Sequence, residues 1–238
     1  MFIDADVQIR KELIGSAISY FESKQLKLLS LFPDQILKSS GEKITVPIMH
    51  WILLTLLPLF LIRKSRLAAF SAANGQFMLF EAHNYTRHQY HKLVKSHPVE
   101  DIKIMKIMKR KGFLTATLLG NGLIFCRMYH GHEEALRGFS KNIIDFFGGS
   151  IIILMLYNII TTFSLFIMAI GWNVYYAVAY LILLLYMKVL VSKLSRQSIV
   201  ENLLFMLPLH CSQVTISFLA IRSRIRGIFH WKGREIRI

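Results

Sequence analysis

Acidic residues are scarce in this sequence, which has 14 Asp and Glu against 29 Lys and Arg in 238 residues, a formal net charge of +15 at pH 7. Cysteine is scarcer still: Cys126 and Cys211 are the two in the sequence. Two cysteines do not make the disulfide framework of a small secreted domain, so we expect a reducing compartment. No positively charged leader precedes a cleavable apolar core at the N-terminus, and we expect no secreted product. With 54% hydrophobic and 18% charged residues, the composition indicates a basic membrane protein.

Charge is absent altogether from Phe146 to Met187, a stretch interrupted only by Gly171-Trp172-Asn173. Each half is long enough to cross a bilayer of about 30 Å as a helix. We therefore predict a helical transmembrane region over residues 143–221, with spans at about 148–170 and 173–191.

Basic residues flank this stretch on both sides: Lys141 precedes it, and Lys188, Lys193 and Arg196 follow it. By the positive-inside rule, both flanks are cytoplasmic and the Gly171 turn lies outside. The sequence thus predicts a multi-pass protein of the cell (inner) membrane whose catalytic part is cytoplasmic.

A third apolar segment, residues 199–221, carries Glu201, Pro208 and His210. A full crossing would place the basic tail 222–238 outside, against the positive-inside rule. We expect a re-entrant or interfacial hairpin broken near Pro208, which keeps that tail cytoplasmic.

The excess of positive charge also raises the question of nucleic acid. However, the basic clusters 63–66, 109–111 and 222–237 mostly adjoin apolar or amphipathic segments, where attraction to anionic lipid explains them. We therefore expect a membrane and no nucleic acid among the partners.

Residues 1–142 alternate helical with extended patterns. Apolar residues recur at helical spacing over 9–21, and a basic amphipathic helix is predicted from Asp101 to Lys111. Strands are predicted at 26–32, and at 113–119 and 123–129 about a Gly120-Asn121-Gly122 turn. Strands alternating with helices indicate a layered α/β domain.

The apolar segment Val46 to Ile62 has about the length of a short transmembrane helix. Pro47 and Pro58 instead favour a helix in the membrane interface, with Trp51 near the headgroups and residues 63–66 on the lipid phosphates. A crossing here would also separate the acidic residues before it from those after it.

Two carboxylates, Asp4 and Asp6, follow an apolar start. An Asp-x-Asp pair at a strand end offers oxygen ligands to one hard divalent cation, Mg²⁺ or Mn²⁺, that also holds a diphosphate. The alternative is a solvated strand end without a ligand.

Six short motifs occur in an order that carries a family resemblance: Phe2-Ile3-Asp4-Ala5-Asp6, Ala73-Asn74-Gly75-Gln76-Phe77-Met78-Leu79-Phe80, Val99-Glu100-Asp101, Cys126-Arg127-Met128-Tyr129, Gly138-Phe139-Ser140-Lys141-Asn142 and Trp231-Lys232-Gly233-Arg234. Together they resemble the C-terminal part of a membrane-bound family 2 glycosyltransferase, similar to bacterial enzymes that glycosylate carotenoid-type or other isoprenoid lipids. The resemblance implies a partial GT-A, Rossmann-like α/β domain ahead of the helical region. It also implies inverting transfer from a nucleotide-sugar donor to a lipid or other membrane-proximal acceptor.

The resemblance assigns roles to individual residues. Asp4 and Asp6 would hold the cation, Asp101 would be the base for the acceptor hydroxyl, and Glu100 would orient the site. Substrate contacts would come from Asn74, Gly75, Gln76 and Arg127. A backbone approach is expected at Gly75, where a side chain would block substrate or a neighbouring strand.

Many relatives carry a Gln-x-x-Arg-Trp sequence on an interfacial helix beneath the site. This chain has Gly138-Phe139-Ser140-Lys141-Asn142 at the matching place. Lys141 can supply the positive charge, although without the two-pronged contact of Arg, and Phe139 would supply the aromatic acceptor contact.

In this family an N-terminal half precedes the Asp-x-Asp motif and holds the nucleotide, so we expect such a half as a partner of this chain. Two alternatives stay open: an inactive remnant that only binds membrane or a partner, and a membrane scaffold or transporter component. Four histidines, His83, His88, His91 and His97, match no zinc spacing, and we expect them near the acceptor path.

Overall fold

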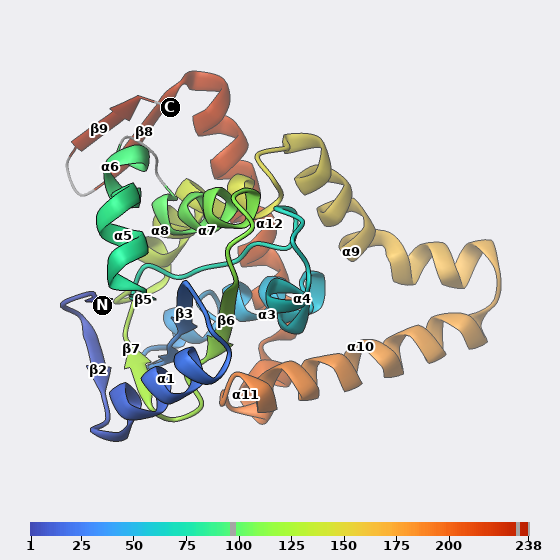
Figure 1. The fold of residues 1–238 in the computed structure, drawn as a ribbon. Helices are drawn as coiled ribbons and strands as arrows, with labels where there is room; N and C mark the ends of the chain where they lie inside the picture. The colour runs from blue at the N-terminus through green and yellow to red at the C-terminus, as the bar shows by residue number, and fades with distance from the viewer. Residues whose placement is uncertain (96–98, 232–233, 238) are drawn as a thin grey trace. The chain divides into compact units, whose positions relative to one another are not determined.

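The computed structural model describes residues 1–95, 99–231 and 234–237, with side chains up to Gly227 (Figure 1). The chain divides into two compact units. The first comprises Met1–Ile36, Met49–Met128 and Leu194–Arg196, and the second comprises Leu37–Ile48, Tyr129–Lys193 and Gln197–Ile238.

The first unit holds most of the strands: β1 (Phe2–Ile3), β2 (Val7–Ile9), β3 (Leu28–Phe32), β4 (Asp34–Gln35), β5 (Phe77–Phe80), β6 (Thr115–Leu119) and β7 (Ile124–Cys126). Its helices are α1 (Glu12–Ser23), α3 (Ile48–Leu56), α4 (Leu59–Lys64), α5 (Ala82–His88), α6 (Tyr90–Val94) and α7 (Glu100–Arg110). The second unit contains α2 (Ser40–Lys43), α8 (His132–Phe146), α9 (Ile151–Gly171), α10 (Val174–Leu194), α11 (Ile199–Leu204), α12 (Met206–Arg226), β8 (Ile228–Trp231) and β9 (Arg234–Arg237).

The main sheet of the first unit has the strand order β1-β5-β3-β6. The β3 strand is buried along its whole length, as its apolar sequence predicts for a central strand. It pairs in parallel with β6, while β5 runs antiparallel to both β3 and β1. Mixed α/β content is thus confirmed, and the sheet combines parallel with antiparallel pairs.

A second sheet has the order β2-β7-β4. The predicted hairpin of two strands about Gly120-Asn121-Gly122 is wrong, because β6 belongs to the main sheet and β7 to this one. The turn redirects the chain instead: the Leu123 N–H donates to the Gly120 carbonyl at 2.9 Å, and the Gly122 N–H donates to the Asp34 carboxylate at 2.7 Å. A Cβ at position 120 would lie 2.7 Å from the Ile124 side chain, so only glycine fits this bend.

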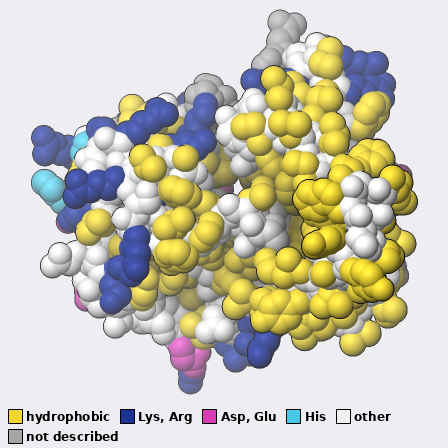
Figure 2. All heavy atoms as spheres, turned by 90° about the vertical axis from the view of Figure 1, so that its right-hand side faces the viewer, with side chains coloured by type: hydrophobic (Ala, Val, Ile, Leu, Met, Phe, Trp, Pro, Cys, Tyr) yellow, Lys and Arg dark blue, Asp and Glu magenta, His cyan; other side chains and the backbone are white. Residues whose placement is uncertain are grey.

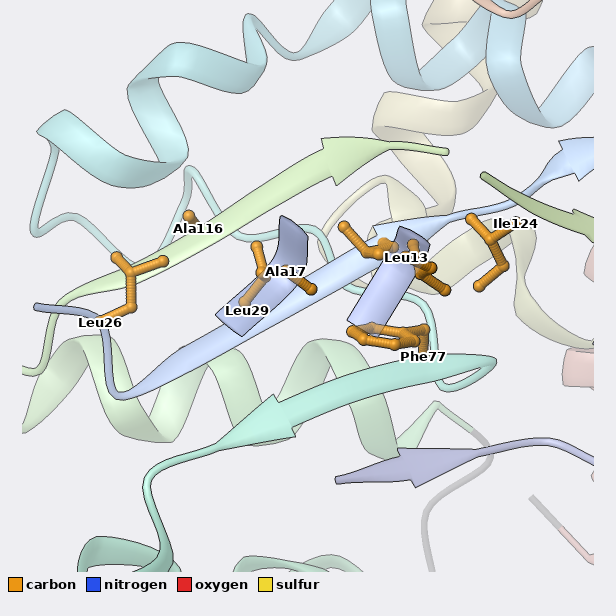
Figure 3. Packing of buried hydrophobic residues seen from close by; sticks show 8 residues of the cluster. Leu13, Ala17, Leu26, Leu29, Phe77, Ala116 and Ile124 are labelled. Carbon is orange, nitrogen blue, oxygen red and sulfur yellow. The ribbon is translucent and has the colours of Figure 1, made fainter. Parts of the chain in front are cut away.

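One hydrophobic core joins α1 to the sheets. Leu13 and Ala17 of α1 pack with Leu29, Phe77 and Ile124, which come from β3, β5 and β7 (Figure 3). These side chains are almost fully buried, and each large one contributes roughly 1.5–3 kcal/mol of transfer free energy. The core therefore fixes the strand ends that carry the acidic residues.

The apolar segment 46–62 forms two helices, α3 and α4, instead of one, because Pro58 cannot continue α3 and serves as the N-cap of α4. The first half of α3 is buried, including His50, whose pKa burial lowers to about 4. Phe60 and Leu56 are exposed. A position of this segment in the membrane interface stays a prediction.

The prediction that Lys109 belongs to a basic cluster attracted to anionic lipid is wrong, because its side chain is buried. Its side chain is 3% exposed, and its ammonium donates to the Ser65 carbonyl at 3.1 Å and to the Phe70 carbonyl. Burial lowers the pKa of Lys109 to about 8. Lys109 therefore fastens the segment that leads into β5.

The second unit contains two helices, α9 and α10, that are long and apolar enough to cross a membrane. Their boundaries lie within a few residues of the predicted spans. Large apolar side chains on both are exposed, and Ile170 is 85% exposed. Figure 2 shows a broad apolar surface on the side where these helices lie in Figure 1. An exposed apolar surface of this kind is typical of a site that contacts a membrane or a protein, and the length of the two helices is evidence for a membrane.

The third apolar segment is broken at Phe205, between α11 and α12, and not at Pro208. Pro208 falls in the first turn of α12, where its missing N–H costs nothing. α12 then continues to Arg226 and ends at Gly227, which has a left-handed backbone (φ 67°). In the Trp231-Lys232-Gly233-Arg234 motif, Lys232 and Gly233 lie outside the described residues.

Candidate functional site

Asp4 lies at the end of an edge strand next to the loop before β5. The pairing of Ile3 with Phe77 brings the two segments together, and the Asp4 N–H donates to the Gln76 carbonyl at 3.3 Å. Partial burial of the carboxyl group and, second, the charge of Asp6 raise the pKa of Asp4 above its ordinary value. Two carboxylates of the predicted pair therefore influence each other directly.

Asp6 is placed by the second sheet. Because Val7 of β2 pairs with Cys126 of β7, Asp6 comes beside the Cys126 thiol and hydrogen-bonds to it. Burial first, then the charges of Asp6 and Asp4, raise the pKa of Cys126 to about 12. Cys126 is therefore a protonated donor to Asp6 and not a thiolate nucleophile.

The loop Asn74-Gly75-Gln76 is held by hydrogen bonds. Ser30 of β3 makes two hydrogen bonds to this loop. The Asn74 N–H donates to the Ser30 hydroxyl at 2.7 Å, and that hydroxyl donates to the Asn74 carbonyl at 3.0 Å. The Asn74 amide donates to the Gln76 side-chain oxygen at 3.1 Å, and the Gln76 amide donates to the Cys126 sulfur at 2.8 Å. Both predicted contact residues are buried and satisfied within the chain, so their first role here is to shape the loop.

Asp101 stands at the start of α7 and faces the same loop. Its carboxylate accepts the Gly75 N–H at 2.9 Å and the Ile102 N–H at 2.8 Å. Burial raises the pKa of Asp101 to about 6 against the effect of these hydrogen bonds, and the charge of Asp4 adds to the rise. The charge of Asp4 therefore acts on Asp101, although the two residues are far apart in the sequence.

The expected steric role of Gly75 differs from what the structure shows. A Cβ at this position would meet only the Asp101 carboxylate, at 3.9 Å, which is ordinary van der Waals contact. No neighbouring strand is blocked among the described residues, and the contact that Gly75 makes is through its N–H. A close approach of substrate to its backbone stays a prediction.

Glu100 and Arg127 flank the group. Glu100 is half-buried beside Asp101, and its charge acts on His91 of α6, whose pKa is lowered chiefly by burial. Arg127 follows Cys126 directly and is half-buried. His83 and His88 lie on α5, and His97 lies outside the described residues.

Phe139 and Lys141 lie on α8, in the second unit. Phe139 is buried against the Tyr129 ring, at 5.0 Å between centroids, a core contact that accounts for it without an acceptor. Lys141 is half-buried. Its contact with a diphosphate stays a prediction.

The donor set suits Mg²⁺ or Mn²⁺ in type, since Asp4 and Asp6 offer carboxylate oxygens and Mg²⁺ is usually held by one or two carboxylates plus water and substrate phosphates. Over residues 1–95, 99–231 and 234–237, no group of three or more His, Cys, Asp or Glu side chains is arranged to hold a metal ion. A cation here would therefore depend on the substrate to complete its ligands.

Two residues of the group, Ser30 and Cys126, were not predicted as site residues from the sequence. Ser30 is the one polar residue in the buried strand Leu28–Phe32, a signal that it bonds something specific. Cys126 stands in a motif that had been noticed, but its partner depends on the register of β2 against β7.

No protein-family model, no curated protein and no solved structure matches this chain. Function is therefore inferred from the residues of the site and from the apolar helices.

Proposed function

We propose that this chain is part of a membrane-associated, inverting glycosyltransferase of the family 2 type, with a partial GT-A, Rossmann-like domain. It transfers a sugar from a nucleotide-sugar donor to a lipid or other membrane-proximal acceptor, with a nucleoside diphosphate as the leaving group. The observation that carries the proposal is the gathering of Asp4, Asp6 and Asp101 around the loop 74–76, from segments about 100 residues apart in sequence.

Asp101 suits the role of base for the acceptor hydroxyl. Its raised pKa of about 6 makes the carboxylate a stronger proton acceptor than an ordinary Asp, while it stays largely ionised at pH 7. The Gly75 and Ile102 N–H groups fix its orientation. Proton transfer in the transition state requires a base that is held in one orientation and whose pKa lies near the working pH.

In the proposed reaction, the acceptor oxygen forms a bond to the anomeric carbon from the face opposite the diphosphate. The bond from that carbon to the diphosphate oxygen breaks with its electron pair, and the acceptor proton passes to Asp101. The products are the inverted glycoside and the nucleoside diphosphate.

Asp4 and Asp6 would hold Mg²⁺ or Mn²⁺, which when bound supplies charge stabilisation for the departing diphosphate. The thiol of Cys126 donates to Asp6 and accepts from Gln76, so it holds Asp6 in place at the strand end. Asp4 is held by its backbone bond to Gln76. The loop 74–76 thereby positions both the carboxylates that would hold the cation, Asp4 and Asp6, and the base, Asp101.

A lipid acceptor fits the second unit. α9 and α10 present a large exposed apolar surface and are long enough to cross a bilayer, which favours a membrane as the cover of that surface. An acceptor with a long apolar tail would be concentrated in the same membrane, and only its hydroxyl end would have to leave the bilayer.

The test is transfer of radiolabelled sugar from a panel of nucleotide sugars to membrane lipid extract, using membranes that contain the chain with and without its upstream coding region. We expect a lipid-soluble product that requires Mg²⁺ or Mn²⁺. Replacing Asp101 with Asn should reduce transfer by at least about a thousandfold, since base and positioning terms are both lost.

Glu22→Gln is the matched control, because Glu22 is exposed on α1, away from the site. It should transfer sugar like the wild type. Full activity of Asp101→Asn would remove Asp101 as the base. Absence of transfer with every donor, with the upstream region supplied, would favour a membrane-binding role without catalysis.

A further inference from the structure

The two faces of the main sheet are covered by different helices. Ile3 and Phe77, which pair across β1 and β5, belong to the core that packs against α1. Side chains alternate between the two faces along a strand, so the next pair, Phe2 and Met78, lies on the opposite face. Phe2 therefore points away from α1.

This opposite face is covered by α7. The register of the sheet places Thr117 of β6 in one row with Met78, with β3 between them. The Thr117 hydroxyl donates to the Met105 sulfur of α7 at 3.8 Å, so α7 packs over this face. Because Asp101 stands in the first turn of α7, Phe2 and Asp101 lie on the same face of the sheet.

Phe2 is the exposed ring of an aromatic cluster. The centroid of its ring lies 4.7 Å from that of His91, 5.2 Å from that of Tyr85 and 5.7 Å from that of Phe80. Tyr85 and His91 come from α5 and α6, which follow β5 in the chain (Figure 1). Phe80 is buried, whereas Phe2 is 40% exposed. The neighbouring rings thus hold Phe2 in place and leave part of it accessible.

Polar groups flank the exposed ring. The Tyr85 hydroxyl and Nδ1 of His91 share a hydrogen bond of 2.8 Å. When Nδ1 accepts that bond, Nε2 holds the ring hydrogen and is a donor. Asp4 follows Phe2 by two residues, and its N–H continues the strand pairing by donating to the Gln76 carbonyl, so its carboxylate lies on the side of Phe2. The ring is therefore flanked by a donor from α6 and a carboxylate from its own segment.

We propose that Phe2, Tyr85 and His91 form a subsite for a sugar of the acceptor, so that the acceptor is a glycolipid whose sugar hydroxyl receives the new sugar. One face of a pyranose carries C–H groups with slightly positive hydrogens, which suit the negative face of an aromatic ring. Hydroxyl groups at its rim bond to His91 and Asp4. The assignment to an acceptor rests on the proposed function, and the bonds that form and break are those of the proposed transfer.

The spacing between Phe2 and Asp101 suits an acceptor with more than one sugar. Met78 lies opposite Phe2, and Gly75, whose N–H binds the Asp101 carboxylate, precedes Met78 by three residues. At about 3.4 Å per residue, this separation is about 10 Å along the chain. A disaccharide has about this length, so one sugar can lie on Phe2 while a hydroxyl of the next one reaches Asp101.

Two other parts of the substrates fit this subsite less well. An isoprenoid chain offers no hydroxyl groups to His91 and Asp4. A nucleobase would stack on Phe2, yet His91 lies on α6, which packs against α7, the helix that carries the base for the acceptor.

The test is binding of free saccharides to the full chain, measured by saturation-transfer NMR. The chain is kept in a detergent without sugar groups, and cellobiose, maltose or lactose is added, with neither nucleotide nor divalent cation. We expect at least one disaccharide to receive saturation at its C–H protons. Phe2→Ala should weaken its binding about fivefold, while Phe2→Tyr should preserve it, because the ring remains.

Phe60→Ala is the matched control, since Phe60 is 60% exposed on α4 of the same unit, outside the aromatic cluster. It should bind the disaccharide like the wild type. Equal losses in Phe2→Ala and Phe60→Ala would show unspecific contact with exposed rings and overturn the proposal. A wild type that binds none of the disaccharides, or binding that Phe2→Ala leaves unchanged, would overturn it too.

Uridine diphosphate and farnesol are the competing probes, and neither should reduce the saturation of the disaccharide. Displacement would assign the subsite to a nucleobase or to an isoprenoid chain and overturn a sugar ligand. If Phe2→Ala fails to fold by circular dichroism, Tyr85→Phe replaces it. This variant keeps the ring but removes the hydroxyl that orients His91, and it should weaken binding about threefold.

Saccharide binding and sugar transfer are measured separately, so the two proposals can fail independently. Transfer to lipid extract without binding of any disaccharide would overturn the sugar subsite alone. Binding that depends on Phe2, without transfer from any donor, would overturn the proposed transfer and leave a chain that binds saccharides.

Discussion

The Gly75 N–H donates to the Asp101 carboxylate across a distance of 2.9 Å, and this one bond ties the loop before β5 to the start of α7. Because the donor is a backbone group, the position of Asp101 depends on the course of the loop and not on a side chain at position 75. The Ser30 hydroxyl, which bonds both the N–H and the carbonyl of Asn74, sets that course.

Asp101 is expected to lower the stability of the folded chain at neutral pH. Its pKa is raised from 3.8 to about 6, so the folded state favours the protonated form. The associated stability is fully present below about pH 4 and is lost as the pH rises through about 6. At pH 7.5 the free energy of unfolding of Asp101→Asn, measured by urea titration, should therefore exceed that of the wild type by about 3 kcal/mol. At pH 4 the two proteins should unfold at nearly the same urea concentration.

The comparison between the two pH values is the control for this variant, since other groups titrate alike in both proteins. A difference that is the same at both pH values would mean that burial does not perturb Asp101.

Cys126 should resist alkylation in the folded chain. The pKa of its thiol is raised to about 12, so hardly any thiolate exists at pH 8, and the residue is buried. With Cys211→Ser as the background, intact mass should show no adduct after maleimide treatment at pH 8, and one adduct after denaturation. An adduct on the native protein would mean that the bonds to Asp6 and Gln76 are not formed.

The sequence predicted two helices of the first unit, α1 and α7, because their patterns are local. The periodic apolar residues over 9–21 and the amphipathic stretch Asp101–Lys111 correspond to α1 (Glu12–Ser23) and α7 (Glu100–Arg110). The buried strand predicted at 26–32 corresponds to β3 (Leu28–Phe32). Each of these elements carries its own signal within a dozen residues.

Strand pairing was predicted less well because it is decided far along the chain. A Gly-Asn-Gly turn between two apolar runs is typical of a hairpin, yet β6 pairs with β3 and β7 with β2 and β4. The parallel partner of β6 begins 87 residues earlier, as Thr115 lies opposite Leu28. No local pattern records such a choice.

The same limit applies to the site. Asp4, Asp6 and Asp101 could be singled out as acids in motifs, but the roles of Ser30 and Cys126 depend on which strands lie side by side. Lys109 was wrongly placed in a surface cluster with its charged neighbours. Its side chain is instead buried, and its ammonium donates to the Ser65 carbonyl.

Gly138 should tolerate no side chain. A Cβ at this position would lie 2.4 Å from the Tyr129 ring, which packs directly over α8. Gly138→Ala should destabilise the chain by about 1–3 kcal/mol through overpacking. Thermal unfolding followed by circular dichroism measures the change.

Gly15→Ala is the matched control, since Gly15 lies within α1 and nothing stands within 4 Å of its missing Cβ. Alanine should stabilise that helix by roughly 0.5–1 kcal/mol. Equal effects of the two substitutions would show that the Tyr129 contact does not constrain position 138.

Membrane insertion of α9 should be sensitive to charge at its middle. Ile160 is 60% exposed near the centre of this 21-residue helix, so Ile160→Arg would put a charge at mid-bilayer at a cost of about 3 kcal/mol. We expect the fraction of chain that stays in the membrane pellet after an alkaline carbonate wash to fall.

Leu204→Arg is the control, because Leu204 is 73% exposed but ends the short helix α11, outside both apolar helices. This substitution should leave the pelleted fraction unchanged. If Ile160→Arg stays in the pellet as wild type does, α9 does not cross the hydrocarbon region, and the exposed surface of α9 and α10 must be covered by protein instead.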